Sequence, residues 1–255
     1  MRALHYSIPL VILVLFSTVM VFLYNQTWVL GIGIGLIGLV SLYFLKDAID
    51  WKYYVKNPPM PEPPVVKLLT EIPFYKQLND LDRDKFQKRL ALFMIAHDFK
   101  MQPSKRSEEE DATDAPEDIK AICSIPAIIL TFYEENFLLK EIEQVVLYNH
   151  PFPSPRYHEL HSCESNKEDK VLIFSLPHLE KGVKDPFTYF DVGMYEWARI
   201  SENISYHCID WNQFAQSQGI NKEAYERVIG LAHIDLPAVC RVTEIHQGYL
   251  HMLKS

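Results

Sequence analysis

The chain has 255 residues, 48% hydrophobic and 23% charged, a composition that indicates a folded protein and argues against disorder, collagen or a polytopic transporter. Acidic side chains outnumber basic ones by 33 to 25, so the formal net charge is −8 at pH 7. An acidic chain offers no electrostatic footprint for nucleic acid, so DNA and RNA are not expected partners. The four cysteines lie at irregular intervals that make neither a disulfide framework nor a CxxC metal knuckle, and they fit a reducing compartment.

Two apolar runs, residues 8–24 and 28–45, open the chain and are separated by only three residues. At 1.5 Å per residue each run extends about 26 Å, enough for the hydrocarbon core of a bilayer. The pattern predicts a transmembrane helical hairpin within residues 1–51, with the lipid bilayer as a partner through residues 8–45. A cleaved signal peptide is disfavoured, because no small-x-small site follows the first run and a second run begins at once.

Positive charges flank this hairpin only on the outside of the pair. Arg2 precedes the first run, Lys46, Lys52 and Lys56 follow the second, and the intervening turn has no charge. The positive-inside rule therefore predicts a multi-pass protein of the inner (cytoplasmic) membrane with both termini and the body in the cytoplasm.

Glycines in the second run spell two known patterns. Residues 33–38 read GxGxxG, but a dinucleotide site needs a strand before it and a solvated helix after it, so the match inside a membrane span is accidental. Gly31 and Gly35 form GxxxG, which favours close helix approach; two loosely packed helices remain the alternative.

A proline-rich stalk is predicted over residues 52–65. Residues 57–64 contain five prolines, which favour an extended spacer of about 25 Å at 3.1 Å per residue. The following body, residues 66–255, is predicted to be α+β, because it mixes helical periodicity with short apolar runs. Helices are expected over 82–96 and 117–132, strands over 145–148 and 171–174, and further helices near 191–205, 222–233 and 237–253.

His158, His161 and Cys163 form a first candidate metal site. Two histidines on one helix face converge on an ion at i, i+4 spacing, whereas these stand at i, i+3 between a proline-rich break and a polar stretch. We interpret them as ordinary loop residues, whose replacement by alanine would leave stability nearly unchanged, and keep a zinc site as the alternative.

The segment 191–200, DVGMYEWARI, is the second candidate site. With its surroundings it resembles the Mlc titration factor (MtfA)-like zinc peptidases, whose active helix reads N-hydrophobic-x-L-H-E-F-A-H. The strand and turn at 171–186, the helix at 119–132, the strand at 145–153 and the helical segment at 74–99 are similar in order and spacing. The resemblance covers roughly residues 74–205 and implies a zincin-like metallopeptidase-type domain.

The departure from the family is at the metal ligands. Tyr195 and Arg199 stand where the family has its two zinc-binding histidines, and only the acid, Glu196, is retained as a vestigial general base. Tyrosine is a poor ligand unless ionised, and a guanidinium has no lone pair for a metal. At i, i+3 from Glu196, Arg199 is placed to neutralise that carboxylate. The family's third ligand has no secure counterpart, and Glu244 is only on the right kind of element.

No other nucleophile or cofactor site is evident. His207 and Cys208 are adjacent and so point to different helix faces, and Cys240 reads as a buried apolar residue. The sequence therefore predicts a catalytically inactive, membrane-anchored protein without a metal cofactor that binds a protein or peptide. One alternative is an active zinc peptidase that uses ligands such as His158 and His161. The other is a membrane scaffold of unrelated fold.

Overall fold

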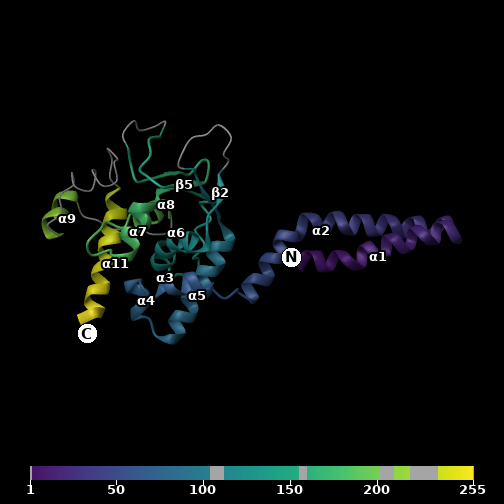
Figure 1. The fold of residues 1–255 in the computed structure, drawn as a ribbon, viewed down its shortest axis with the longest axis horizontal. Coiled ribbons are helices and arrows are strands. Elements are labelled where there is room, and N and C mark those ends of the chain that lie inside the picture. The colour runs from purple at the N-terminus through teal and green to yellow at the C-terminus, as the bar shows by residue number, and fades with distance from the viewer. Residues whose placement is uncertain (1, 104–111, 155–159, 202–209, 219–234, 255) are drawn as a thin grey trace. The chain divides into compact units, whose positions relative to one another are not determined.

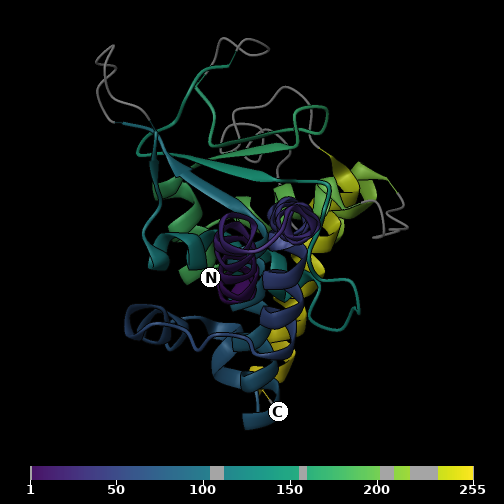
Figure 2. The ribbon, with the colours of Figure 1, turned by 90° about the vertical axis from the view of Figure 1, so that its right-hand side faces the viewer.

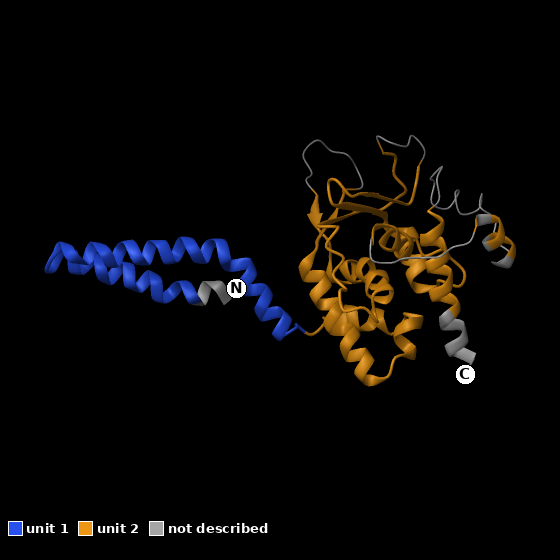
Figure 3. Ribbon diagram, turned by 180° about the vertical axis from the view of Figure 1, so that it is seen from behind, with its two compact units in different colours: residues 1–59 blue, residues 60–255 orange. Residues whose placement is uncertain are grey.

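The computed structural model describes residues 2–103, 112–154, 160–201, 210–218 and 235–254. The chain divides into two compact units, residues 1–59 and 60–255 (Figure 3). The second unit combines helices with a mixed sheet, so the predicted α+β class is confirmed. The expected helix near 222–233 lies outside the described residues.

The first unit is an antiparallel helical hairpin (Figure 1). Helix α1 (Arg2–Leu23) leads through the short 3-10 turn η1 (Gln26–Trp28) into α2 (Val29–Lys56). Both helices are long and apolar enough to cross a membrane, with mean hydropathies of 2.4 and 2.2 in their best windows. Only 6% of each of those windows is buried within the chain, so the apolar side chains face outward, as they would towards lipid.

The glycines of α2 bring it close to α1. A Cβ added to Gly31 would lie 2.4 Å from Ser17 Oγ, and one added to Gly35 would lie 2.4 Å from Val14 Cγ2. By contrast, a Cβ on Gly33 would meet nothing within 4 Å. The GxxxG pair thus faces α1 of the same hairpin, and its spacing permits the close helix approach that the sequence suggested.

The extended stalk is shorter than the predicted 52–65. Helix α2 continues to Lys56, and α3 (Pro63–Leu69) begins at Pro63, so only residues 57–62 lie outside a helix. Proline is well accommodated at the first positions of a helix, where its missing N–H has no partner to lose. The two last prolines of the stretch therefore start a helix and do not extend the spacer.

Eight helices and five strands are described in the second unit. After α3, the helices are α4 (Pro73–Gln77), α5 (Asp80–Ala96), α6 (Glu117–Leu130), α7 (Leu176–Lys184), α8 (Val192–Ile200), α9 (Trp211–Gln218) and α11 (Leu236–Lys254). The strands are β1 (Asp98–Met101), β2 (Thr113–Asp114), β3 (Gln144–Tyr148), β4 (Cys163–Asn166) and β5 (Val171–Ser175).

The strands form one sheet in the order β2-β1-β3-β5-β4. The three inner strands β1, β3 and β5 run parallel, and each edge strand pairs antiparallel with its neighbour. Only β3 and β5 were predicted from apolar runs. The other three are short and contain polar residues, which is common for strands at or near the edge of a sheet.

One face of the sheet and the helices beneath it make the core (Figure 2). Its strand residues are Phe99, Val145, Leu147, Cys163, Leu172 and Phe174, all 2% exposed or less. Helix α6 is buried from Ala121 to Leu130 and packs against both α5 and α8. Helix α8 also contacts the edge strand β4 and the last helix α11, so its side chains meet groups from three directions.

Candidate functional site

The first turn of helix α8 lies in close contact with α7 and α6. The Asp191 carboxylate caps its N-terminus by accepting a hydrogen bond of 2.8 Å from the backbone N–H of Met194. A Cβ on Gly193 would lie 2.5 Å from a Leu179 methyl and 2.8 Å from Pro126. Glycine is therefore required there for α8 to pack against α7 and α6.

Glu196 and Arg199 form an ion pair on α8, as their spacing predicted. Arg199 donates to Glu196 Oε2 from Nε at 3.1 Å and from Nη2 at 2.8 Å. Its Nη2 also donates to Ser165 Oγ on β4 at 2.5 Å. The Glu196 side chain is fully buried, whereas that of Arg199 is 30% exposed. The pair therefore fastens α8 to the edge strand.

The electrostatics favour a charged Arg199 and protonated Cys163 and Tyr195 side chains at neutral pH. Burial alone would lower the pKa of the Arg199 guanidinium, but the charge and hydrogen bonds of Glu196 outweigh burial and raise it. Burial, with a smaller contribution from Glu196, raises the pKa of the Cys163 thiol well above its usual value. Burial also raises the pKa of Tyr195, whose Oη accepts a 3.1 Å hydrogen bond from the Asp235 backbone N–H.

These residues do not fit a zinc ion. A guanidinium offers no lone pair, and a protonated phenol or thiol is a poor ligand, because metals bind the deprotonated groups. Glu244, the tentative third position, is exposed on α11. Across the described ranges of the chain, no three His, Cys, Asp or Glu side chains are grouped so that they could hold a metal.

His161 is not the ordinary loop residue that its sequence context suggested. It is 1% exposed, pairs through an isolated bridge with Phe152, and its Nε2 lies 3.0 Å from Glu164 Oε2. Alanine at this position would leave Glu164 without its buried partner, so we now expect His161→Ala to reduce stability. Its partner in the predicted metal pair, His158, lies outside the described residues.

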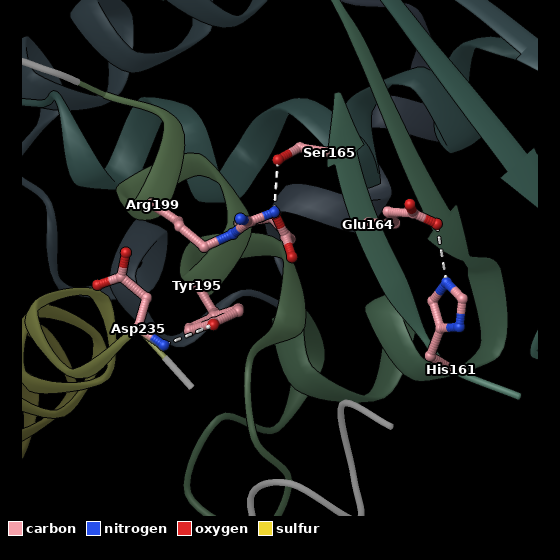
Figure 4. A network of polar contacts seen from close by, with 7 residues as sticks. His161, Glu164, Ser165, Tyr195, Arg199 and Asp235 are labelled. Atoms are coloured by element: carbon pink, nitrogen blue, oxygen red, sulfur yellow. Dashed lines mark hydrogen bonds and ion pairs between the residues drawn. The ribbon is translucent and has the colours of Figure 1, made fainter. Parts of the chain in front are cut away.

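His161 and the ion pair belong to opposite faces of β4. Successive strand side chains alternate between faces, and Ser165 contacts Arg199 while the neighbouring Glu164 contacts His161 (Figure 4). The structure therefore does not bring His161 to Glu196.

The cysteines only partly follow the sequence prediction. Cys123 and Cys163 are free and buried. Cys240 is nearly fully buried, as expected, but it is disulfide-bonded and not a free thiol. Apolar periodicity reports burial only, so it cannot distinguish a buried thiol from a buried disulfide. Cys208 lies outside the described residues.

Sequence reasoning did not place three members of the cluster beside α8: Ser165 and Asp235 were not singled out, and Cys163 was grouped with His158 and His161. Ser165 and Cys163 reach α8 from a strand about 30 residues earlier, and Asp235 reaches Tyr195 from the start of α11. The segment CESN does not alternate between apolar and polar residues, so its sequence did not indicate a strand beside α8.

Comparisons with protein-family models, with curated proteins and with solved structures found no match to this chain. The resemblance to MtfA-like peptidases therefore stays a prediction, as does the zincin-like identity of the fold.

Proposed function

We propose that this protein is a membrane-anchored, peptidase-like domain that does not catalyse hydrolysis and acts by binding a protein or peptide partner beside α8. The observation that supports this proposal most directly is the ion pair between Arg199 and Glu196. It occupies two of the three α8 positions at which the resembled family would hold zinc and activate water.

The chemistry of the pair argues against a general base. A peptidase glutamate takes a proton from water that a metal has already activated. Here two N–H groups of one guanidinium bond to Oε2 of Glu196, and the residues around it do not fit a metal. A buried carboxylate with a permanent cation beside it is a structural pair, and the retained acid then has a different role from that in an enzyme.

We place the protein in the inner membrane with both termini in the cytoplasm, on the support of Arg2, Lys46, Lys52 and Lys56. The disulfide at Cys240 points the other way, because disulfides persist mainly in oxidising compartments. The two indications predict opposite results in one experiment, which is described in the Discussion.

The test of the proposed function uses the full chain purified in detergent. We expect no bound zinc by elemental analysis and no hydrolysis of casein. The double substitution Tyr195→His and Arg199→His should create two imidazoles one helical turn apart beside Glu196, and should give measurable zinc binding. Stoichiometric zinc on the unmodified protein that is lost on Glu196→Gln would contradict the proposal.

A further inference from the structure

We infer that Arg199 binds a carboxylate of the partner and that Glu196 orients the guanidinium for this contact. The inference rests on the proposed binding function and names the chemical group that would be recognised.

The guanidinium of Arg199 uses only part of its hydrogen-bonding capacity within the described residues. Of its five N–H bonds, that of Nε and the two of Nη2 are directed to Glu196 and Ser165. The Nη1 amino group makes no hydrogen bond to any described residue, and the side chain is 30% exposed. Among the described residues, two donors of this cation therefore have no partner, and we assign them to a ligand.

Glu196 is the part that fixes this geometry. Its side chain is fully buried and held on a helix whose neighbours are also buried, so its carboxylate cannot follow a moving arginine. An arginine held in this way loses little side-chain entropy when a ligand binds. The retained acid therefore positions Arg199, and this explains a buried glutamate without assigning it a catalytic step.

A carboxylate suits the available donors better than a more highly charged anion. Charge-assisted hydrogen bonds from arginine to carboxylate are among the strongest in proteins. Glu196 already compensates much of the positive charge, and the chain as a whole carries −8. This field disfavours a dianion such as phosphate more than a single carboxylate. A peptide supplies that group at its C-terminus or on an Asp or Glu side chain.

The experiment measures binding of three labelled, degenerate hexapeptide pools to the full chain in detergent micelles. One pool ends in a free carboxylate, one ends in a carboxamide, and one is amidated but contains a single internal glutamate. We expect the two carboxylate-containing pools to bind about tenfold more tightly than the amide pool, the factor that one charge-assisted hydrogen bond contributes. The relative affinity of these two pools identifies the source of the carboxylate.

Substitutions test the two roles separately. Arg199→Gln should remove the preference for the carboxylate, and Glu196→Gln should reduce that preference. If Arg199→Gln does not fold, Arg199→Lys decides, because an ammonium cannot reproduce the planar arrangement and should also lose most of the preference. Lys88→Gln, at an exposed helix position, is the matched control and should bind like the unmodified protein.

The outcomes distinguish failure of carboxylate recognition by Arg199 from failure of the proposed peptide-binding function. If no pool binds, the proposed peptide-binding function is overturned together with the inference. If all three pools bind equally, the function stands and carboxylate recognition by Arg199 is overturned. A preference that survives in folded Arg199→Gln would overturn the inference as well.

Discussion

The indole Nε1 of Trp197 on α8 donates a 3.1 Å hydrogen bond to the backbone carbonyl of Cys123 on α6. Both residues are fully buried, and the carbonyl lies in the most apolar helix of the body. This bond, together with the packing of the indole against Phe93 at 5.3 Å between ring centroids, fixes the position of α8.

Trp197→Phe should therefore destabilise the body by about 1–3 kcal/mol. The substitution removes the indole N–H that donates to the buried Cys123 carbonyl, and it opens a small cavity. Chemical unfolding in detergent, followed by circular dichroism, measures the change. Tyr133→Phe is the control, since Tyr133 is 77% exposed and its replacement should have almost no effect. Equal stability of the two variants would contradict this account of α8.

Arg199→Met should cost about 3 kcal/mol, because it leaves the buried Glu196 carboxylate without its cation; partial exposure of Arg199 keeps the cost at the low end for buried pairs. Adding Glu196→Gln should recover part of the loss, since the stranded charge is then removed as well. The exposed pair of Lys88 with Asp84 gives the comparison, and Lys88→Met should cost about 0.5 kcal/mol or less. A double variant as unstable as the sum of the two single variants would exclude the coupling.

Asp191 and His246 should have opposite effects on the pH dependence of stability. Their side chains lie 3.8 Å apart, and burial raises the pKa of Asp191 to about 7 and lowers that of His246 to about 4. The folded chain thus holds a proton on Asp191 that the unfolded chain has lost, so this contribution falls as pH rises from 3.8 to about 7. The His246 contribution rises between about pH 4 and 6.5, because the folded chain binds its proton less tightly.

In the unmodified protein these two slopes largely cancel between pH 4 and 6.5. Relative to it, Asp191→Asn should become more stable with rising pH and His246→Gln less stable, each by an amount on the order of 2 kcal/mol across the range. Asparagine can still cap the helix, so Asp191→Asn changes the pH dependence of stability without removing the cap. Thermal unfolding at several pH values provides the measurement, and parallel curves for all three proteins would refute the pairing.

Gly35→Leu should separate α1 from α2, whereas Gly33→Leu should not. The first change would force a side chain into Val14, and the second would place it where nothing lies within 4 Å. Oxidative cross-linking of cysteines introduced by Leu10→Cys and Gly38→Cys reports the distance between the helices. We expect efficient cross-linking with leucine at 33 and loss of it with leucine at 35; the same yield in both would show that the glycine contact is not needed.

Reporters fused after Ser255 settle the orientation of the body. If the flanking lysines decide it, green fluorescent protein should be bright there and alkaline phosphatase inactive. Cys240 should then react with alkylating reagents as a free thiol when freshly lysed cells are denatured, which exposes this buried side chain. An active phosphatase together with an unreactive Cys240 would place the body in an oxidising compartment and overturn the cytoplasmic proposal.

Long apolar patterns were the part of the fold that the sequence could predict. The hairpin helices and α6 were anticipated, although α1 begins six residues before its predicted span and α2 extends 11 residues beyond its own. Continuous apolar runs or helical periodicity determine these helices locally. Strands β1, β2 and β4 were missed, because a strand of two to four residues is defined by the strand to which it is hydrogen-bonded and not by its own sequence pattern.

In the candidate site, too, the local contacts could be predicted from the sequence and the contacts between distant residues could not. The pairing of Glu196 with Arg199 follows from helix geometry and was expected. The contact of Arg199 with Ser165 joins residues 34 positions apart, and His161, which pairs with Glu164, is held by an antiparallel bridge to Phe152. Contacts of this kind depend on the tertiary fold, which one sequence read alone does not specify.

The continuity of α2 bears on how mechanical force could pass along the chain. With 28 residues it extends about 42 Å, longer than the hydrocarbon core it would cross, so a rotation of the hairpin about its axis would reach Lys56 without loss. Of the six residues that follow, Asn57 still donates to the Tyr53 carbonyl and the Glu62 carbonyl accepts from Val66, so the non-helical stretch is residues 58–61. Torsion about the backbone bonds of that stretch would dissipate a twist. Tension along the chain, in contrast, passes through such a segment once it is extended. A signal travelling from the membrane helices to the second unit would therefore be carried as pull and not as torque.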